Sequence, residues 1–464
     1  MKAGIELAGK RVLVVGLART GIATALFCVG RGGRVVVSEE RPEEQVAEAA
    51  AKLRAAGVQL ELGGHLLETF LSQDLIIASP GVPLTLLPLE AARKQGIPIW
   101  SEMELAWRFL RGRLVAVTGS NGKTTTTALL GHILETAGIP TVVAGNIGTP
   151  LISRVDASSE STVTVAEVSS FQLETIQSFR PHIALLLNLT PDHLERHVTF
   201  EDYVRAKARL FENQDEHDIA ILNADDSQVA RLAPSRAQVV WFSRLKPVAA
   251  GTYLRDDQIV FRREGTETVL LRRAEIGLRG EHNVENVLAA AAAAFLAGAL
   301  PAAIAAGVGT FAGMEHRLEF VGEIAGISFY NDSKATNVDA TLKAIDAFPG
   351  NQLIILGGKD KGSDFALLRE PLRQRARLAL VIGAAAEKIA AQIEGAVPVE
   401  HAGTLERAVR LSFERARPGD IVLLAPACAS FDQFENFEHR GRVFKQLVRQ
   451  LEREPSTGQP APAH

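Results

Sequence analysis

The chain has 464 residues, 47% of them hydrophobic and 22% charged, which is enough for about three domains with cores of their own. Its formal net charge of −4 gives no electrostatic reason to expect nucleic acid or an anionic membrane surface as a partner. The only two cysteines, Cys28 and Cys428, cannot make a disulfide framework and favour a reducing cytoplasm.

Residues 1–107 alternate short apolar runs with helical periods, which predicts a parallel sheet wound on both faces. Strands are expected at 11–16, 34–40 and 74–81. The first strand leads into Gly16-x-Ala18-x-x-Gly21, which is similar to a dinucleotide-binding fingerprint with its middle glycine replaced. That glycine normally lets a pyrophosphate approach the backbone, so Ala18 counts against a nicotinamide cofactor.

Residues 108–312 open with a glycine-rich run, TGSNGKTT, directly after the apolar stretch 114–117. Such a loop between a strand and a helix cradles phosphates, because its N–H groups and the helix N-terminus point at the anion. The spacing differs from the common phosphate loop, since Val117 stands where the first glycine is expected. The pattern predicts ATP binding, with Lys123 on the β- and γ-phosphates and the Thr124 hydroxyl on Mg²⁺.

Two further strands, 161–170 and 182–190, carry polar residues at their C-terminal ends, where ligands bind in open α/β sheets. Glu167 ends the first, and Asp192-His193 follows the second. Their place beside a phosphate loop suits Mg²⁺, which prefers oxygen ligands. Lys207 lies in an amphipathic, base-rich segment, and on this pattern alone it is a surface lysine.

The rest of this region contains two less distinctive segments. Residues 236–273 read as short strands and turns, which predicts a small antiparallel appendage. No charged residue occurs between Glu285 and Glu315, but this stretch is rich in alanine and is interrupted by Pro301. Since alanine contributes little to membrane insertion, we expect two buried helices and no membrane span.

Residues 313–464 form a third α/β region with strands near 327–332, 352–358, 378–383 and 421–427. Dense polar runs follow three of these strands: NDSKATN (331–337), GGKDKGSDF (357–365) and PACASFDQFENFEHRG (426–441). The side chains of Lys334, Thr336, Lys361 and Ser430 suit a substrate with carboxylates. The composition from about residue 455 predicts a disordered tail.

Two residues outside these loops are candidate nucleotide contacts. Asn283, before the alanine-rich helix, could contact an adenine edge or only cap the helix. Arg317 could clamp a phosphate with its planar fork, or form an ordinary surface ion pair.

These motifs together resemble the Mur ligases of peptidoglycan synthesis over residues 10–450, and most closely the members that add D-glutamate. TGSNGKTT, GNIGTP (145–150), EVSSFQLE (167–174) and Asp192-His193 look like the general ATP and Mg²⁺ framework. The three polar runs of the last region look like the D-glutamate branch. The resemblance implies three domains: a Rossmann-like UDP-binding domain (1–107), a central P-loop ATPase-like domain (108–312) and a C-terminal Rossmann-like amino-acid-binding domain (313–464).

The resemblance also implies a reaction. ATP phosphorylates the carboxylate of UDP-MurNAc-L-alanine, and the amine of D-glutamate attacks the acyl phosphate to form an amide. It implies a cytoplasmic monomer with two Mg²⁺ ions, bound by Thr124, Glu167, His193 and a carbamylated Lys207. Carbamylation makes Lys207 an oxygen ligand and replaces the surface interpretation. Phosphoryl transfer depends mainly on positioning and charge stabilisation, which suits this set.

The remaining roles follow the same resemblance. Lys123, Glu167, His193, Lys207 and Asp332 would be catalytic, and the amine proton could go to His193 or Asp332. The resemblance weakens at residues 38–41, where the uracil contact is expected and Arg41 is the candidate. ATP would contact Gly119, Ser120, Asn121, Gly122, Lys123, Thr124, Thr125, Asn283, Arg317 and Asp332; the UDP-substrate Arg19, Thr20, Arg41, Gly81 and Asn146; and D-glutamate Lys334, Thr336, Lys361, Ser430 and Phe437.

Three alternatives stay open on sequence alone. The first is a sibling ligase that adds L-alanine, a diamino acid or a dipeptide. The second is a regulatory nucleotide-binding module, against which the polar loops of the third region argue, because a switch needs no second substrate pocket. The third is a dehydrogenase, against which Ala18 and the phosphate loop argue.

Overall fold

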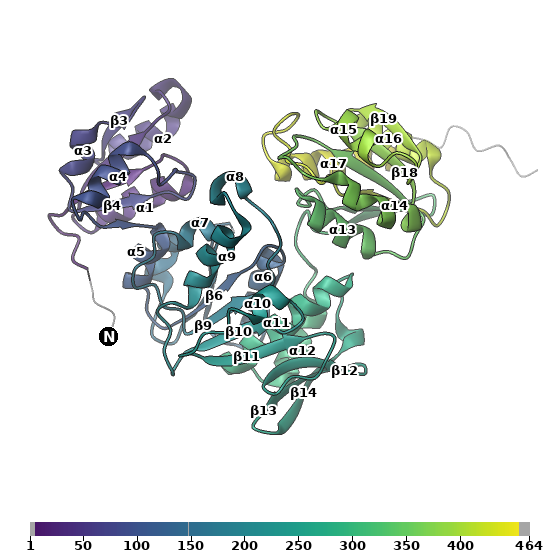
Figure 1. Ribbon diagram of the computed structural model, residues 1–464, viewed down its shortest axis with the longest axis horizontal. Helices are drawn as coiled ribbons and strands as arrows, with labels where there is room; N and C mark the ends of the chain where they lie inside the picture. Colours follow the sequence, from purple (N-terminus) through teal and green to yellow (C-terminus); the bar gives the residue numbers. More distant parts are fainter. Residues whose placement is uncertain (1–4, 147, 454–464) are drawn as a thin grey trace, which may run out of the picture. The chain divides into compact units, whose positions relative to one another are not determined.

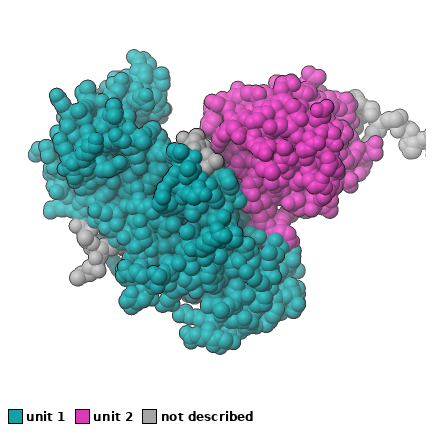
Figure 2. Space-filling model, viewed as in Figure 1, with its two compact units in different colours: residues 1–276, 285–311 teal, residues 277–284, 312–464 magenta. Residues whose placement is uncertain are grey.

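The computed structural model describes residues 5–146 and 148–453, and its elements are labelled in Figure 1. The chain forms two compact units, shown in teal and magenta in Figure 2. Unit 1 comprises residues 1–276 and 285–311, and unit 2 comprises residues 277–284 and 312–464. The disordered tail predicted from about residue 455 lies outside the described residues.

The first sheet of unit 1 is parallel and has the strand order β3-β2-β1-β4-β5. Because side chains alternate along a strand, Val12 and Val14 pack on one face and Leu13 and Val15 on the other. Helices α1 and α2 cover the first face, and α3 and α4 the second. The bounds are β1 (Arg11–Val15), α1 (Arg19–Gly30), β2 (Arg34–Glu39), α2 (Glu43–Ala55), β3 (Gln59–Leu62), α3 (Leu67–Leu71), β4 (Leu75–Ala78), α4 (Leu87–Lys94) and β5 (Ile99–Trp100).

The second sheet of unit 1 has nine strands in the order β14-β13-β12-β11-β10-β9-β6-β8-β7. Antiparallel pairing is present as predicted, but only for β12 to β14; β11 pairs in parallel with both β10 and β12. The predicted appendage is therefore a continuation of the central sheet. The strands are β6 (Arg113–Thr118), β7 (Thr141–Gly145), β8 (Val163–Glu167), β9 (Ile183–Leu186), β10 (Ile219–Asn223), β11 (Gln238–Ser243), β12 (Gly251–Arg255), β13 (Gln258–Arg263) and β14 (Thr266–Arg272).

The helices that accompany this sheet include the two predicted in the alanine-rich stretch, and residues 289–294 of that stretch are fully buried. A Cβ at Gly307 would come within 2.9 Å of the Ile133 Cα, so glycine permits the close contact of α12 with α6. Within the described part of the chain, none of the helices has the length and apolar character needed to cross a membrane. The helices are α6 (Lys123–Thr136), α7 (Ser170–Leu173), α8 (Leu194–His197), α9 (Phe200–Ala208), α10 (Ser227–Ala230), α11 (Glu281–Ala297) and α12 (Pro301–Thr310), with the 3₁₀ helices η1 (Leu151–Ala157), η2 (Arg209–Phe211) and η3 (Arg273–Glu275).

One hydrophobic cluster connects the two sheets of unit 1. It runs from β1 and α1 through α5 (Glu102–Phe109) and η1 into the core beneath β6. The Phe27 and Phe109 rings meet edge to face at 5.1 Å within it. This shared core explains why the first two regions form one compact unit.

The sheet of unit 2 has the order β15-β16-β20-β17-β18-β19, and only β15 runs antiparallel to its neighbour. Alternating residues again serve two cores: Ile354 faces α13, α14 and α15, while Leu353 faces α16 and α17. The bounds are β15 (Glu319–Ile324), β16 (Ile327–Asn331), α13 (Val338–Asp346), β17 (Gln352–Gly357), η4 (Phe365–Leu368), α14 (Arg369–Arg375), β18 (Ala376–Ile382), α15 (Ala386–Gln392), β19 (Val399–Gly403), α16 (Leu405–Arg415), β20 (Ile421–Leu424) and α17 (Phe437–Arg453).

Candidate active site

The predicted phosphate loop connects β6 to α6, as the sequence indicates. Gly122 precedes the first turn of α6 with φ 83°, a left-handed conformation that favours glycine. A Cβ there would also lie 2.3 Å from the Asn286 Oδ1 atom on α11. Both conditions explain why a glycine stands at this position, and Thr124 and Thr125 are buried in the turn that follows.

The loop is held by two residues at the polar end of the predicted strand 182–190, Asn188 and Thr190, which the sequence analysis did not name individually. Asn188, two residues past the end of β9, accepts from the Asn121 N–H at 2.7 Å and donates to the Asn121 carbonyl at 3.0 Å. The Ser120 hydroxyl bonds to the Thr190 carbonyl at 2.9 Å and lies 2.9 Å from the Tyr203 hydroxyl. These contacts fix the loop before any phosphate binds, and the polar end of β9 was the signal that could have revealed them.

Lys123 and Lys207 both bond to backbone carbonyls of the loop. The Lys123 Nζ donates to the Gly119 and Ser120 carbonyls at 2.8 and 2.7 Å. The Lys207 Nζ donates to the Gly119 carbonyl at 2.8 Å and lies 4.7 Å from the Tyr203 ring centre. Only 1% of Lys207 is exposed, so the surface-lysine interpretation from periodicity is wrong. Burial, together with the Lys123 charge, lowers the pKa of Lys207 well below its usual value.

Glu167 ends β8, next to β6 in the sheet, as predicted. The Asn146 amide donates to its Oε1 at 2.8 Å, while its buried Oε2 has no hydrogen-bond partner in the described part of the chain. A buried carboxylate oxygen without a partner is unfavourable unless something supplies positive charge. This orphaned acceptor fits a Mg²⁺ ligand.

His193 has a left-handed backbone, with φ 53°, and its ring packs against Phe171 at 4.9 Å. Asp192 lies 3.7 Å from the ring Nε2. Among the described residues, no three histidine, cysteine or acidic side chains converge as a metal-binding group. The structure thus places Lys123, Glu167 and Lys207 within electrostatic range of one another, but it does not draw His193 into a preformed cluster with them.

All five residues predicted to contact the UDP-substrate line one cavity of about 620 Å³ in unit 1. They are Arg19, Thr20, Arg41, Gly81 and Asn146. The cavity also contains Glu39, which the sequence analysis did not single out. The Glu39 Oε2 accepts from the Leu17 N–H at 2.5 Å, and Oε1 pairs with the Arg41 guanidinium at 2.8 Å. Burial would raise the pKa of Glu39, but the bonds from Arg41 and Leu17 outweigh it and lower the pKa to about 2.

The three predicted polar loops of unit 2 lie together, because their strands β16, β20 and β17 are neighbours in that order. The Ala427 N–H donates to the Ala335 carbonyl at 2.9 Å, and Lys359 and Ala429 form a short antiparallel bridge. The Lys334 ammonium lies 4.3 Å from the Phe437 ring centre. Ser430 is buried, whereas Lys361 is exposed.

A buried arginine that the sequence analysis overlooked fastens these loops. The Arg440 guanidinium donates to the Ser333 carbonyl at 2.8 Å and to the Cys428 carbonyl at 3.1 Å. Burial lowers its pKa to about 10. Because its hydrogen bonds in the described structure go to uncharged oxygens, this guanidinium adds positive potential beside Lys334.

The remaining nucleotide candidates lie in unit 2. Burial raises the pKa of Asp332 to about 7, against the opposing effect of the nearby Arg317 charge. Asn283 lies in the first turn of α11, and its side-chain amide donates to the Arg279 carbonyl at 2.6 Å. Its neighbour one turn on, Asn286, belongs to unit 1 and contacts the phosphate loop instead.

Three family models match successive parts of the chain. The Mur ligase MurD-like N-terminal domain matches residues 10–101, the Mur ligase middle domain residues 117–294, and the Mur ligase glutamate ligase domain residues 316–428. The chain therefore belongs to the Mur ligase family, whose members are ATP-dependent amide-forming ligases. This confirms the family predicted from the motifs.

Relatives place the chain within the family. A protein from Koribacter versatilis is 52% identical over 96% of this chain and 99% of its own length, and one from Acidobacterium capsulatum is 54% identical over 96% and 97%. Both are named UDP-N-acetylmuramoylalanine–D-glutamate ligase. The chain groups with these enzymes, the MurD branch.

Solved structures share the fold. A pseudomurein peptide ligase type C from Methanothermus fervidus covers 96% of this chain and all of its own at 19% identity, with a TM-score of 0.61. The MurF ligase from Thermotoga maritima in complex with ADP covers 96% of both chains at 17% identity, also with a TM-score of 0.61. The predicted three-part α/β fold is confirmed, whereas the roles of individual residues remain predictions.

Proposed function

We propose that this chain joins D-glutamate to UDP-MurNAc-L-alanine in an ATP-dependent step of peptidoglycan synthesis. The observation that carries the proposal is the 52–54% identity to ligases of that name along nearly the whole chain. The geometry supports it with a phosphate loop and a large cavity in unit 1, and a cluster of basic and hydroxyl side chains in unit 2.

The proposed reaction has two steps. The γ-phosphoryl group of ATP moves to an oxygen of the L-alanyl carboxylate, so that a P–O bond forms there while the bond to the β-phosphate oxygen breaks and ADP leaves. The amine of D-glutamate then attacks the acyl carbon. A C–N bond forms, the C–O bond to phosphate breaks, and the nitrogen loses a proton to His193 or Asp332, between which the choice stays open.

In unit 1, we assign the loop residues 119–125 to the ATP phosphates. Lys123 already lies on the loop carbonyls and exchanges those contacts for phosphate oxygens. Two Mg²⁺ ions, with Thr124, Glu167, His193 and Lys207 as ligands, would neutralise charge on the transferring phosphoryl group. The partnerless Glu167 oxygen supports its share of this role.

Lys207 is proposed to act as a carbamate. The lowering of its pKa by burial favours the neutral amine, whose lone pair can attack CO₂, forming an N–C bond and releasing a proton. The product carries oxygen donors, which suit Mg²⁺ better than an amine nitrogen does. The neighbouring Lys123 ammonium favours this change, because an anionic group there pairs with it.

The other proposed contacts follow from the cavity and the loops. The UDP part of the substrate occupies the cavity of Arg19, Thr20, Arg41, Gly81 and Asn146. D-glutamate binds the loops of unit 2 through Lys334, Thr336, Lys361, Ser430 and Phe437. Asn283, Arg317 and Asp332 contact the nucleotide. Residues 1–107, 108–312 and 313–464 accordingly serve UDP-substrate, ATP and amino acid.

Phosphate release from ATP tests the proposal. With UDP-MurNAc-L-alanine present, turnover should require D-glutamate and be absent with L-alanine, L-lysine, meso-diaminopimelate or a dipeptide. Turnover with one of these but not with D-glutamate would contradict the proposal in favour of a sibling ligase. Absence of turnover with every acceptor, despite ATP binding, would favour the regulatory nucleotide-binding module.

The carbamate is tested with Lys207→Ala. The variant should lose most activity and regain part of it with added acetate or propionate, which supply a carboxylate in the space left. Full activity without the acid would remove Lys207 from the site. Carbon-13 spectra of the wild-type protein in labelled bicarbonate should show a carbamate signal that the variant lacks.

A cytoplasmic location and a monomeric state are part of the same proposal. Both cysteines are buried and free, which suits a reducing compartment. Sedimentation at two protein concentrations checks the monomer, since a dimer would shift with dilution.

A further inference from the structure

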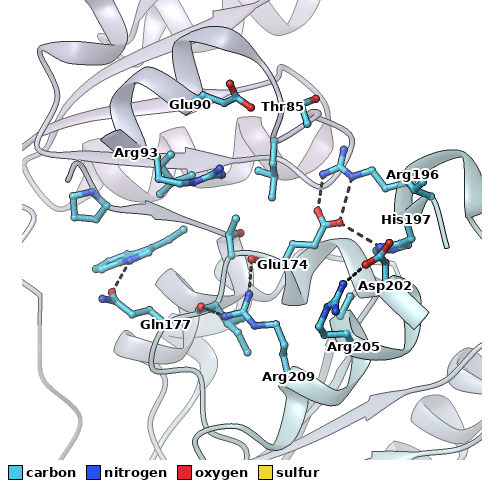
Figure 3. Close-up of a pocket in the computed structure, with 18 of the residues that line it drawn as sticks. Thr85, Glu90, Arg93, Glu174, Gln177, Arg196, His197, Asp202, Arg205 and Arg209 are labelled. Carbon is cyan, nitrogen blue, oxygen red and sulfur yellow. Dashed lines mark hydrogen bonds and ion pairs between the residues drawn. The ribbon is translucent and has the colours of Figure 1, made fainter. Parts of the chain in front are cut away.

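Arg196 lies where three elements of unit 1 meet, beside a second cavity of about 830 Å³ that is separate from the UDP cavity. Figure 3 shows it over Glu174, with His197 on the other side of that carboxylate. Its Nη2 and Nε contact the two Glu174 oxygens at 2.6 and 3.4 Å, and its Nη1 donates to the Val82 carbonyl at 2.9 Å. Its planar fork therefore joins α8 to the end of α7 and to the loop after β4.

The loop after β4 is part of the UDP cavity. Ser79, Gly81 and Val82 line that cavity, and the Val82 N–H closes a tight turn on the Ser79 carbonyl at 3.0 Å. Arg196 thus holds the turn through the outward carbonyl of Val82. If the turn moves when substrate binds, the hydrogen bond to the Val82 carbonyl transmits that movement to the Arg196 guanidinium.

Arg196 also contacts His193, through its backbone and through Phe171. The Arg196 N–H donates to the His193 carbonyl at 3.0 Å, and its guanidinium lies 5.3 Å from the Phe171 ring centre. Phe171 in turn packs on the His193 ring. His193 is thus constrained by Arg196 both through its backbone and through an aromatic neighbour, while its own backbone is left-handed and needs such support.

Two other arginines that line the second cavity, Arg205 and Arg209, make contacts that Figure 3 also shows. Arg205 pairs with Asp202 on the same helix, and its side chain is 75% exposed. Arg209 binds Glu212 and two nearby backbone carbonyls. Neither reaches the loop after β4 in the contacts of the described residues, so the cavity provides a matched control for Arg196.

We propose that Arg196 is a positioning residue that couples occupation of the UDP cavity to the placement of His193. This inference rests on the proposed function, because it needs UDP-MurNAc-L-alanine as the occupant. The coupling requires a planar guanidinium, because Nε and Nη2 bind the Glu174 carboxylate while Nη1 binds the Val82 carbonyl. A lysine has a single ammonium nitrogen and cannot make both contacts in this geometry. Glu174 is a part of the same device, since its side chain is only 17% exposed and loses its strongest partner without Arg196.

The test compares Arg196→Lys and Arg196→Ala with Arg205→Ala. Both Arg196 variants should lower kcat/KM for UDP-MurNAc-L-alanine by about 10- to 100-fold and raise the Mg²⁺ concentration for half-maximal rate, while KM for ATP stays within about twofold. Arg205→Ala should match the wild type. Wild-type-like kinetics of Arg196→Lys would overturn the inference, because charge alone would then suffice.

Binding and rescue give readouts that do not depend on turnover. In calorimetry, Mg²⁺ should raise the affinity for UDP-MurNAc-L-alanine in the wild type but not in Arg196→Ala; equal Mg²⁺ effects in both would overturn the coupling. Methylguanidinium, which can enter from the adjoining cavity, should restore part of the Arg196→Ala rate, and methylammonium should not. Equal rescue by both ions would overturn the requirement for the fork.

Folding and the proposed function are separated by two controls. Unchanged circular dichroism and melting temperature of Arg196→Lys show that its kinetic loss is not misfolding, and a melt below the assay temperature would instead overturn the positioning role in favour of a structural one. A wild-type protein that binds no UDP-MurNAc-L-alanine would overturn the proposed function and this inference with it. If the wild type binds UDP-MurNAc-L-alanine and Arg196→Lys is fully active, only this inference is overturned and the proposed function stands.

Discussion

Two loops of unit 1 have the same plan and opposite electrostatics. Each loop follows a buried strand, β1 or β6, contains glycine and leads into a helix. The first residue of that helix is basic: Arg19 in α1 and Lys123 in α6. In the first loop the Glu39 carboxylate already occupies the Leu17 N–H. In the second, the Asn188 amide binds the loop backbone, Lys123 brings positive charge to its carbonyls, and the Lys207 nitrogen donates to the Gly119 carbonyl.

The difference shows that glycine spacing provides room, while the surrounding charges decide what fills it. In the first loop the Leu17 N–H is therefore already bonded to a carboxylate whose pKa is about 2, so a phosphate in this cavity must use other donors, such as Arg19. At the second loop an anion meets the Lys123 side chain. Ala18 argues against the dehydrogenase alternative, and membership in the Mur ligase family excludes it.

The largest expected effect comes from removing the base of the second loop. Lys123→Ala should lower kcat about 10³-fold, because one preorganised charge on the transferring phosphoryl group is lost. Phosphate release with saturating substrates measures it. Arg19→Ala, at the matching position of the first loop, should raise KM for UDP-MurNAc-L-alanine and leave KM for ATP unchanged; a rise in KM for ATP would contradict the separation of the two loops.

The next effect concerns the backbone of the second loop. Gly122→Ala should raise KM for ATP about tenfold or more, since a left-handed alanine costs about 1–2 kcal/mol and its Cβ meets Asn286. Gly138→Ala has the same left-handed strain, with φ 71° and nothing within 4 Å, and should leave KM for ATP unchanged. Adding Asn286→Ala to Gly122→Ala should recover part of the loss; no recovery would show that strain alone acts.

A smaller effect is expected in the first loop. Glu39→Gln keeps an acceptor for Leu17 but weakens the bond to Arg41, so the orientation of Arg41 in the UDP cavity is loosened. KM for UDP-MurNAc-L-alanine should rise several-fold with kcat unchanged, as initial rates can show. Glu44→Gln removes the same charge from an exposed position on α2 and should have no effect. A loss of kcat in Glu39→Gln would mean that the first loop also acts in the chemical step.

The comparison also shows what could be predicted from sequence. Strands such as β1, β8 and β16, and the helices around Pro301, were predictable because their signals are local: apolar runs, turn residues and periodicity. The gathering of the three polar loops in unit 2 was predictable from their shared position at strand ends, and the order β16-β20-β17 explains it.

What sequence patterns missed depends on partners far along the chain. Lys207 looks like a surface lysine in its own helix, and partners distant in the sequence, such as the Gly119 carbonyl 88 residues away, make its burial tolerable. The partners of Glu39, Asn188 and Arg440 were likewise not predictable, because each bonds to a backbone group brought near only by the fold; for Asn188, the polar end of β9 was the one signal. The family resemblance identified Lys207 where periodicity could not.

The last expected effect is on stability and leaves turnover aside, and it sharpens the contrast between two buried carboxylates. Like Glu39, Glu102 accepts backbone N–H groups, and the Ile152 nitrogen lies 2.6 Å from its Oε1. Unlike that of Glu39, its pKa is shifted by burial without an opposing cation. Its Oε2 has no hydrogen-bond partner in the described part of the chain. Burial therefore raises its pKa from 4.5 to about 7. Below pH 4.5 the carboxyl is neutral in the folded and unfolded states. As the pH rises from 4.5 to 7 the unfolded state loses its proton first, so the folded state loses stability, by about 3 kcal/mol at most.

Glu102→Gln keeps the neutral shape at every pH. Its melting temperature should equal that of the wild type at pH 4 and exceed it at pH 8, as thermal melts across this range can measure. A gap that is constant with pH, or a less stable variant at pH 8, would show that Glu102 stays ionised in the fold and that cation-free burial is not what distinguishes it from Glu39.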